Sequence, residues 1–266
     1  MTQRSSGPPR RPRFPATLPS ASIPRPAVKI SATPRPAVRT LAPVAVQTTG
    51  LGLDSSAVRH ALIRRLAAQP GMAEPVLQVM ARIERHRFVE PALVNQAYED
   101  TSLPIGFGQT ISKPGVVSRM LSLLGQGREG SRLGKVLEIG TGCGYQAAVL
   151  SGLATQVISI ERIKGLHEKA RANIRGMGLH NLHLILADGM LGYAPGGPYD
   201  TIISAAGGDD IPKAWMDQLA MGGKLIAPCS VASGEQALIL IERTPTGDVR
   251  QVFEAVRFVP LKSGTA

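Results

Sequence analysis

From residue 135 onward, short apolar segments alternate with helical stretches, and this alternation restricts the fold more than any other feature of the sequence. The apolar segments predict strands at 135–139, 156–160, 182–186, 199–204, 223–227 and 236–242, with helices near 145–153, 163–177 and 212–220. Continuous apolar strands separated by helices are typical of a parallel sheet that is covered on both faces. No helix separates the last two strands, so we expect an antiparallel edge hairpin. The sequence therefore predicts an α/β fold with a doubly wound, mainly parallel sheet.

Two short helices are predicted before this region. Asp54-Ser55-Ser56 is a favourable N-cap cluster, and Val58, Leu62 and Leu66 then recur every four residues until Gln69-Pro70-Gly71 ends the helix. The second helix should carry on one face the residues Val76, Leu77, Met80 and Ile83. We expect both helices to pack against a larger core.

The first 53 residues differ in composition from the rest of the chain. They hold eight basic residues, no acidic residue and 10 of the 21 prolines. Proline at this density blocks helices and sheet ladders alike. We therefore predict a disordered, Pro/Arg-rich tail over residues 1–53 with polyproline-II character, followed by one folded domain over residues 54–266.

Most of the net charge of +11 belongs to this tail, because the remaining residues carry 22 basic against 19 acidic side chains. A basic folded domain would suggest a nucleic-acid partner. Here the folded part is close to neutral, so the composition favours a solvated tail over an electrostatic tether to nucleic acid.

Cysteine usage and hydropathy exclude several classes of protein. Cys143 and Cys229 are the two cysteines, too few for a disulfide framework or a cysteine zinc site. The histidines show no spacing that would place metal ligands on one face, and no apolar run approaches the roughly 18 residues of a membrane span. We therefore expect a cytoplasmic monomer that contacts no membrane and holds no metal ion.

A glycine-rich turn follows the strand at 135–139, with Gly140, Gly142 and Gly144 opening the next helix. Glycines let a backbone turn sharply and approach a ligand closely. Glu161 ends the second strand and Asp188-Gly189 follows the third. Because the carboxyl ends of parallel strands meet at one edge of a sheet, we expect a ligand crevice there. Glu161 suits the two hydroxyls of a ribose, and the carboxylate of Asp188 could accept a hydrogen bond from an adenine amino group.

Two cofactor classes fit this turn. Gly142-x-Gly144-x-x-Ala147 satisfies the dinucleotide fingerprint, so an NAD-dependent enzyme is one alternative. Glu138, in the strand before the turn, would repel a pyrophosphate, whereas it could hold the turn or face a cationic ligand. The sequence also lacks a clear hydride-transfer constellation. Acidic residues at 138, 161 and 188 favour a sulfonium cofactor, S-adenosylmethionine, and hence a methyltransferase.

Further motifs carry a closer resemblance. Ala97–Asp100, Leu103–Gly106 and Gly108–Ser112 precede the turn, and Val256–Leu261 lies near the end of the chain. Together with Leu137–Gly142 and Ser159–Arg162, these segments resemble the protein-L-isoaspartate O-methyltransferase family over about residues 55–262. The segment Gln109-Thr110-Ile111-Ser112 is the most specific of them. Cys143 departs from the family, which usually has serine at that position in bacteria.

The resemblance implies a Rossmann-like methyltransferase that uses S-adenosylmethionine. Such an enzyme methylates the α-carboxylate of L-isoaspartyl residues in damaged proteins and peptides, and the ester closes to a succinimide whose hydrolysis restores some normal aspartate. Residues 54–266 would be the catalytic domain.

The resemblance also implies roles for individual residues. Ser112 would be the catalytic residue that orients the substrate carboxylate, although it could also be a helix N-cap, because Lys113-Pro114 follows it. The expected cofactor-binding residues include those of the glycine turn and the acidic residues described above. They are Thr110, Ile111, Glu138, Gly140, Gly142, Gly144, Glu161, Asp188 and Gly189. The expected substrate cleft contains Val116, Leu261 and Lys262.

Two other hypotheses agree less well with the residues. Methyltransferases that modify nucleic-acid amino groups commonly carry an Asp/Asn-Pro-Pro-aromatic motif after the fourth strand, where this chain has Ser204-Ala205-Ala206-Gly207. A non-enzymatic nucleic-acid binder built on a degenerate methyltransferase fold would need a lost cofactor site. The glycines and acids of that site are all present.

Overall fold

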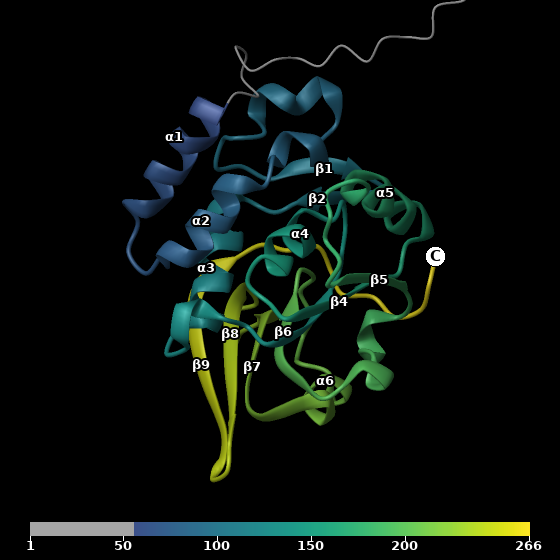
Figure 1. Ribbon diagram of the computed structural model, residues 1–266. Coiled ribbons are helices and arrows are strands. Elements are labelled where there is room, and N and C mark those ends of the chain that lie inside the picture. Colours follow the sequence, from purple (N-terminus) through teal and green to yellow (C-terminus); the bar gives the residue numbers. More distant parts are fainter. Residues whose placement is uncertain (1–55) are drawn as a thin grey trace, which may run out of the picture. The chain divides into compact units, whose positions relative to one another are not determined.

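A seven-stranded sheet organises residues 56–266, the part of the chain that the computed structural model describes (Figure 1). The predicted tail over residues 1–53 lies outside the described residues, as do Asp54 and Ser55 of the predicted N-cap cluster. Among the described helices, none is both long enough and apolar enough to cross a membrane.

The sheet has the strand order β5-β4-β3-β6-β7-β8-β9, and its first five strands run parallel. Its strands are β3 (Lys135–Ile139), β4 (Gln156–Glu161), β5 (Leu182–Leu186), β6 (Tyr199–Ser204), β7 (Leu219–Ser230), β8 (Gln236–Thr244) and β9 (Gly247–Val256). The mainly parallel α/β sheet predicted from the sequence is confirmed. The central strands are buried on both faces, which is why their sequences are continuously apolar.

The antiparallel pairing predicted for the edge of the sheet is confirmed, and the sheet has one further strand that the sequence did not predict. β7 and β8 do pair antiparallel, but β9 pairs with β8 and takes the edge position. β9 is largely exposed, so its sequence lacks the apolar run that marks the other strands. The predicted helix at 212–220 is also too long, because the chain enters β7 at Leu219.

Six α-helices accompany the sheet within residues 56–266. They are α1 (Ser56–Ala67), α2 (Glu74–Arg82), α3 (Pro114–Gly125), α4 (Tyr145–Ser151), α5 (Lys164–Ile174) and α6 (Lys213–Gln218). Short 3-10 helices connect them: η1 (Arg85–Phe88), η2 (Pro91–Gln96), η3 (Glu129–Ser131), η4 (Gly189–Leu191) and η5 (Ala194–Gly196). α1 ends before Gln69-Pro70-Gly71 as predicted, whereas Ile83 is the C-cap of α2 rather than part of its helical face.

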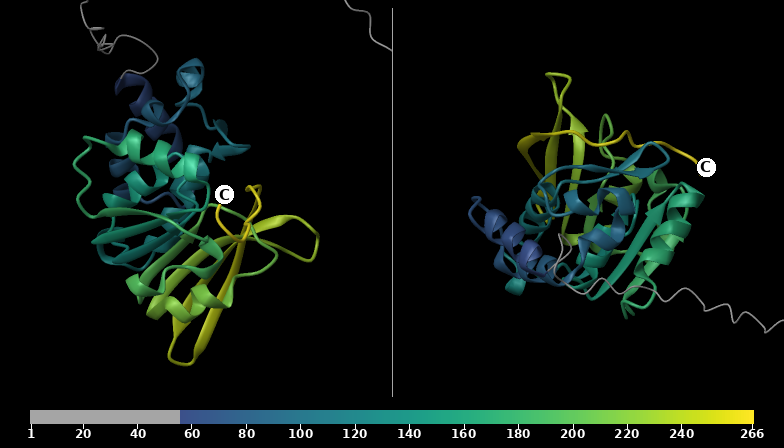
Figure 2. Two further views of the ribbon diagram at one scale, coloured as in Figure 1. Left: turned by 90° about the vertical axis from the view of Figure 1, so that its right-hand side faces the viewer. Right: turned by 90° about the horizontal axis from the view of Figure 1, so that it is seen from above.

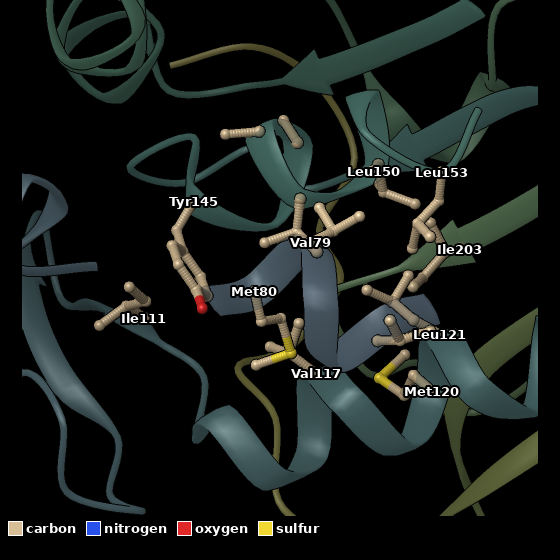
Figure 3. Close-up of a cluster of buried hydrophobic side chains, with 14 of the residues drawn as sticks. Val79, Met80, Ile111, Val117, Met120, Leu121, Tyr145, Leu150, Leu153 and Ile203 are labelled. Carbon is tan, nitrogen blue, oxygen red and sulfur yellow. The ribbon is translucent and has the colours of Figure 1, made fainter. Parts of the chain in front are cut away.

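Two apolar cores lie on opposite faces of the sheet. On one face, Ile203 of β6 packs with residues of α2, α3 and α4, and Figure 3 shows Met80 and Leu121 directed into this cluster. On the other face, Leu137 and Ile202 pack with Trp215 of α6. Figure 2 shows the helices and the sheet from two further directions. Successive strand residues point to opposite faces, so burial on both faces confirms the doubly wound arrangement.

Two segments outside the sheet cover its carboxyl edge. The hairpin of β1 (Leu103–Gly106) and β2 (Gln109–Ile111) approaches the glycine turn: a Cβ added to Gly142 would meet Ile105 Cδ1 at 3.2 Å. The C-terminal residues 259–266, which we call the C-terminal strap, cross from β6 toward β4. The Leu261 N–H donates to the Gly207 carbonyl at 2.7 Å, and the Ala266 N–H donates to the Arg162 carbonyl at 2.8 Å.

Candidate active site

A crevice of about 460 Å³ opens at the carboxyl ends of the central strands. β3 lies between β4 and β6: the chain adds β4 and β5 on one side of β3 and then β6 and β7 on the other, so the strand order reverses at this point. Open α/β sheets bind their ligands at such switch points, and the volume lies in the usual range for small-molecule sites. The crevice walls are the turn after β3, residues 160–163, Gly189, residues 205–206, the β1–β2 hairpin and residues 259–262 of the strap.

The glycine turn forms the floor of this crevice. Gly140 and Gly142 have φ angles of 88° and 55°, which favour glycine over residues with a Cβ. Both residues line the crevice. Gly144 serves a different purpose, because a Cβ there would meet Ala170 Cβ of α5 at 3.3 Å. Gly144 therefore allows close packing between the start of α4 and α5.

Glu161 places a carboxylate in the wall of the crevice, with only 4% of the residue exposed. Its Oε2 accepts the Gly142 N–H at 2.8 Å and its Oε1 accepts the Ile163 N–H at 2.9 Å. A carboxylate has about four lone-pair sites, so each oxygen keeps capacity for another donor. Two fixed, adjacent acceptors match a pair of neighbouring hydroxyl groups.

Asp188 holds the loop after β5 and the C-terminal strap. Its Oδ1 accepts the Met190 N–H at 2.8 Å, and its Oδ2 accepts the Gly264 N–H at 2.6 Å. Its neighbour Gly189 lines the crevice, and the Gly189 carbonyl accepts the indole N–H of Trp215 at 2.7 Å. The structure thus brings Gly189 to the crevice and directs both oxygens of Asp188 to the backbone.

Glu138 lies behind the glycine turn, fully buried. Its Oε1 accepts a hydrogen bond from Gln146 Nε2 at 3.0 Å, and its Oε2 accepts one from the Ser159 hydroxyl at 2.5 Å. The Ser159 hydroxyl also forms a hydrogen bond with the Thr141 hydroxyl at 2.6 Å. Burial raises the pKa of Glu138 to about 8, although these two donors act in the opposite direction. Of the two roles that the sequence left open, holding the turn matches these contacts, whereas facing a cationic ligand does not.

The raised pKa of Glu138 predicts a pH-dependent stability. Between the ordinary carboxyl pKa of 4.5 and the raised pKa of about 8, the folded state retains the proton, whereas the unfolded state releases it. The free energy of unfolding should therefore fall as pH rises through this window, with a slope approaching ~1.4 kcal/mol per pH unit. Glu138→Gln mimics the protonated group, and urea denaturation at pH 5.5, 7.0 and 8.5 should show a flatter dependence. If the free energy of unfolding changed equally with pH in the wild type and in Glu138→Gln, the raised pKa of Glu138 would be contradicted.

Ser112 lies where the crevice meets a second cavity, which it also lines. Within residues 56–266, no hydrogen bond engages its hydroxyl, which leaves that group available to a bound molecule. The N-cap interpretation of Ser112 is wrong, because α3 begins at Pro114 with Lys113 as its N-cap. Of the other expected residues, Thr110, Ile111, Leu261 and Lys262 line the crevice, while Val116 lines the second cavity.

Sequence reasoning missed Arg85. This residue is 1% exposed, its Nη2 donates to the Ser112 carbonyl at 2.9 Å, and its Nε donates to the Ala97 carbonyl at 2.9 Å. Its guanidinium lies 4.9 Å from the centre of the Tyr145 ring, and burial lowers its pKa. Arg85 therefore fixes the backbone of Ser112. A single arginine between polar residues has no spacing pattern that would indicate this.

Phe107 is a second residue without a sequence signal. It stands at the tip of the β1–β2 hairpin with a φ of 54°, is 62% exposed and lines the crevice. A non-glycine residue in this conformation costs free energy and is concentrated at ligand-binding regions. A Cβ on Gly165 of α5 would collide with the Phe107 ring at 2.2 Å, so the ring lies against the start of that helix.

The thiols and the metal-binding side chains offer no further chemistry near the crevice. Burial raises the pKa of Cys143, and it raises that of Cys229 to about 11, so neither group is a thiolate at neutral pH. In the described part of the chain, no cluster of three His, Cys, Asp or Glu side chains could hold a metal ion.

Comparisons with known proteins agree with this geometry. A model of the family described as protein-L-isoaspartate(D-aspartate) O-methyltransferase matches residues 57–266. The protein-L-isoaspartate O-methyltransferase of Leptothrix cholodnii is 52% identical over 285 residues, which cover 98% of this chain and 97% of that protein. The enzyme of the same name from Methylibium petroleiphilum is 56% identical over 218 residues, 81% of each chain.

Two solved structures share the fold. One, a protein-L-isoaspartate O-methyltransferase, has a TM-score of 0.69 and 28% identity, covering 77% of this chain and 66% of its own. The other, from Plasmodium falciparum, is described as a beta-aspartate methyltransferase in complex with S-adenosyl-L-homocysteine. It has a TM-score of 0.65 and 24% identity, covering 78% of this chain and 97% of its own, a likeness that shows the fold alone.

Proposed function

Because the chain belongs to the protein-L-isoaspartate(D-aspartate) O-methyltransferase family, we propose that its crevice binds S-adenosylmethionine and methylates isoaspartyl residues. It is a protein repair enzyme that transfers the methyl group to the α-carboxylate of L-isoaspartyl residues in damaged proteins and peptides. The resulting ester closes to a succinimide, and hydrolysis of the succinimide restores some normal aspartate.

The crevice residues fit S-adenosylmethionine. Glu161 would hold the ribose hydroxyls through the lone pairs that its two backbone contacts leave free. Gly142 and Gly189 line the crevice, and neither has space for a Cβ, which would meet Ile105 Cδ1 at 3.2 Å or Ile139 Cγ2 at 2.7 Å. The cofactor supplies an electrophilic methyl group on a positively charged sulfur.

The protein's part in the reaction is to position and enclose the substrate. The substrate carboxylate is already ionised at pH 7, so the site needs no strong general base. The Ser112 hydroxyl donates a hydrogen bond to one carboxylate oxygen and leaves the other free to attack. Arg85 keeps this serine in place through its carbonyl. The β1–β2 hairpin and the strap exclude water, and such positioning supplies much of the barrier reduction in enzymes of this kind.

One observation supports this proposal above the others: Glu161 and Ser112 face the same crevice at the switch point of the sheet. A repair assay tests it directly. An isoaspartyl peptide is incubated with the protein and S-adenosylmethionine, and the products are separated by reversed-phase chromatography. We expect the isoaspartyl peptide to be converted progressively to its aspartyl form. Persistence of the isoaspartyl peptide beside an active cofactor would refute the proposal.

Ser112→Ala should lower turnover about tenfold, because one hydrogen bond to a charged group is lost. Cofactor affinity should stay nearly unchanged, since the hydroxyl contacts the substrate. Stability should change by less than about 0.5 kcal/mol, because no described residue depends on this hydroxyl. Steady-state kinetics, calorimetry with S-adenosylhomocysteine and a urea denaturation curve measure the three quantities. Unchanged kcat with a lowered denaturation midpoint would assign Ser112 a purely structural role.

The tail over residues 1–53 should be dispensable for the reaction. The family model begins at residue 57, and all of the described residues that line the crevice lie in the catalytic domain proposed over residues 54–266. Deleting residues 1–50 should leave peptide methylation and the melting temperature essentially intact. Any nucleic-acid binding by the full chain should disappear with the deletion and weaken steeply with salt. An inactive or insoluble truncated protein would show that this segment contributes to the fold.

We also propose that the enzyme acts as a monomer in the cytoplasm. The two free cysteines, both buried, fit a reducing compartment. Light scattering on the purified chain should give a mass near 28.1 kDa. Cell fractionation should recover the protein with other cytoplasmic enzymes.

A further inference from the structure

A groove continues from the crevice along the surface beyond Ser112. The second cavity, of about 1000 Å³, shares Thr110, Ser112, Ala205 and Val259 with the crevice. Its remaining walls are Ser102, Lys113, Val116, residues 234–236 and residues 255–258, and we call it the flanking groove. A third cavity of about 660 Å³ shares Lys113 and Val116 with it and extends to Arg119. A substrate residue that contacts Ser112 therefore has space beside it for the rest of the peptide chain.

The flanking groove carries unpaired positive charge. Lys113 and Arg257 are both exposed, and within the described residues neither side chain forms a hydrogen bond or an ion pair. Lys113 directly follows Ser112, and Arg257 lies two residues before Val259, so both cations are close to the reacting position. Among the described residues that line the groove, Glu235 is the one carboxylate. Two cations against one carboxylate leave a positive balance.

Charged groups in the neighbouring cavity do not offset this balance. The Asp100 carboxylate accepts the Gly115 N–H at 2.7 Å, and its negative charge interacts favourably with the buried Arg85 guanidinium. Glu254 forms an ion pair with Arg119, whose Nε lies 3.0 Å from Oε1. These acids are engaged by their own partners, so Lys113 and Arg257 are the cations available to a bound chain.

We propose that the flanking groove holds the residues beside the isoaspartyl residue, and that Lys113 and Arg257 make the enzyme prefer acidic side chains there. This inference rests on the proposed function and names the substrates that the site takes best. An exposed ion pair changes affinity by up to about fivefold. Two partly screened pairs predict a preference of about three- to tenfold in KM at low salt, which decreases as salt is added.

The test uses three peptides with the same central isoaspartyl residue. The neighbouring residues on both sides are Gln in the first peptide, Glu in the second and Lys in the third. For the wild-type chain we expect the KM of the Glu peptide to be about three- to tenfold below that of the Gln peptide, and the KM of the Lys peptide to be above it. The ratio of two KM values is informative because every peptide carries the same reacting carboxylate.

Substitutions in the groove then assign the preference. The double variant Lys113→Gln, Arg257→Gln should bring the ratio of the Gln-peptide to the Glu-peptide KM close to one, and Lys113→Glu should reduce or invert it. Arg175→Gln removes an exposed cation at the end of α5 and should keep the wild-type ratio. A wild-type ratio of one, or a ratio that survives the double variant, overturns the inference and leaves the proposed function in place. Failure to methylate any of the three peptides overturns the function itself.

Discussion

Glu161→Ala is expected to weaken binding of S-adenosylmethionine about 10- to 150-fold, which corresponds to ~1.5–3 kcal/mol for hydrogen bonds to a charged group. In the wild-type chain, the N–H groups of Gly142 and Ile163 fix the carboxylate in place. Removing the carboxylate eliminates these two bonds and also those that it would form with the ribose. Isothermal calorimetry with S-adenosylmethionine or S-adenosylhomocysteine measures the change. Glu161→Gln should be intermediate, because its amide can accept one of the two backbone N–H groups and repels the other.

Glu168→Ala is the matched control for this experiment. Glu168 lies on α5, seven residues after Glu161, and its side chain is exposed and outside the crevice. Removing its charge should leave cofactor affinity within about twofold, since single exposed charges contribute little. A folded Glu161→Ala variant with the affinity of the wild type would remove Glu161 from the cofactor site.

Trp215→Ala should cause the largest loss of stability, about 3–5 kcal/mol. Trp215 is 1% exposed in the core on the α6 face of the sheet, and its indole N–H donates to the Gly189 carbonyl at 2.7 Å. The substitution creates a cavity and leaves the Gly189 carbonyl without its donor. The melting temperature should fall by on the order of 10 °C. Circular dichroism is the suitable probe, because the variant contains no tryptophan.

Two further variants separate packing from hydrogen bonding at this position. Trp215→Phe keeps most of the apolar volume and should lose about 1–3 kcal/mol for the unsatisfied Gly189 carbonyl. Leu191 lies in η4 together with Gly189, but it is 67% exposed. Leu191→Ala should therefore change the free energy of unfolding by less than about 0.5 kcal/mol. If Trp215→Ala were as stable as Leu191→Ala, the second core would not depend on this residue.

Local patterns in the sequence predict the parallel sheet, because β3, β4 and β6 are buried on both faces and are therefore continuously apolar. β9 escapes prediction, since an exposed edge strand can be polar on both sides. The prediction also omits α3, although Val117, Met120 and Leu124 recur at helical spacing and Pro114 marks its first turn.

The candidate site is predictable only where a residue's role follows from its place in a strand or turn. Glu161 belongs to this group, because the end of a parallel strand sets where its side chain lies. The hydrogen bond between Asp188 and Gly264 joins residues 76 positions apart, and the contact between Arg85 and the Ser112 carbonyl spans 27 positions. No local pattern encodes such pairs. They depend on how the C-terminal strap and η1 pack against the sheet.

The most direct test of the proposed reaction compares two peptides that differ only at one residue. The full chain is incubated with S-adenosylmethionine that carries a labelled methyl group, together with an L-isoaspartyl peptide or its L-aspartyl counterpart, and base-labile methyl ester is counted. We predict rapid labelling of the isoaspartyl peptide and only background labelling of the aspartyl peptide. Equal labelling of both peptides, or no labelling of either by a protein that binds the cofactor, would contradict the assignment of isoaspartate as the substrate.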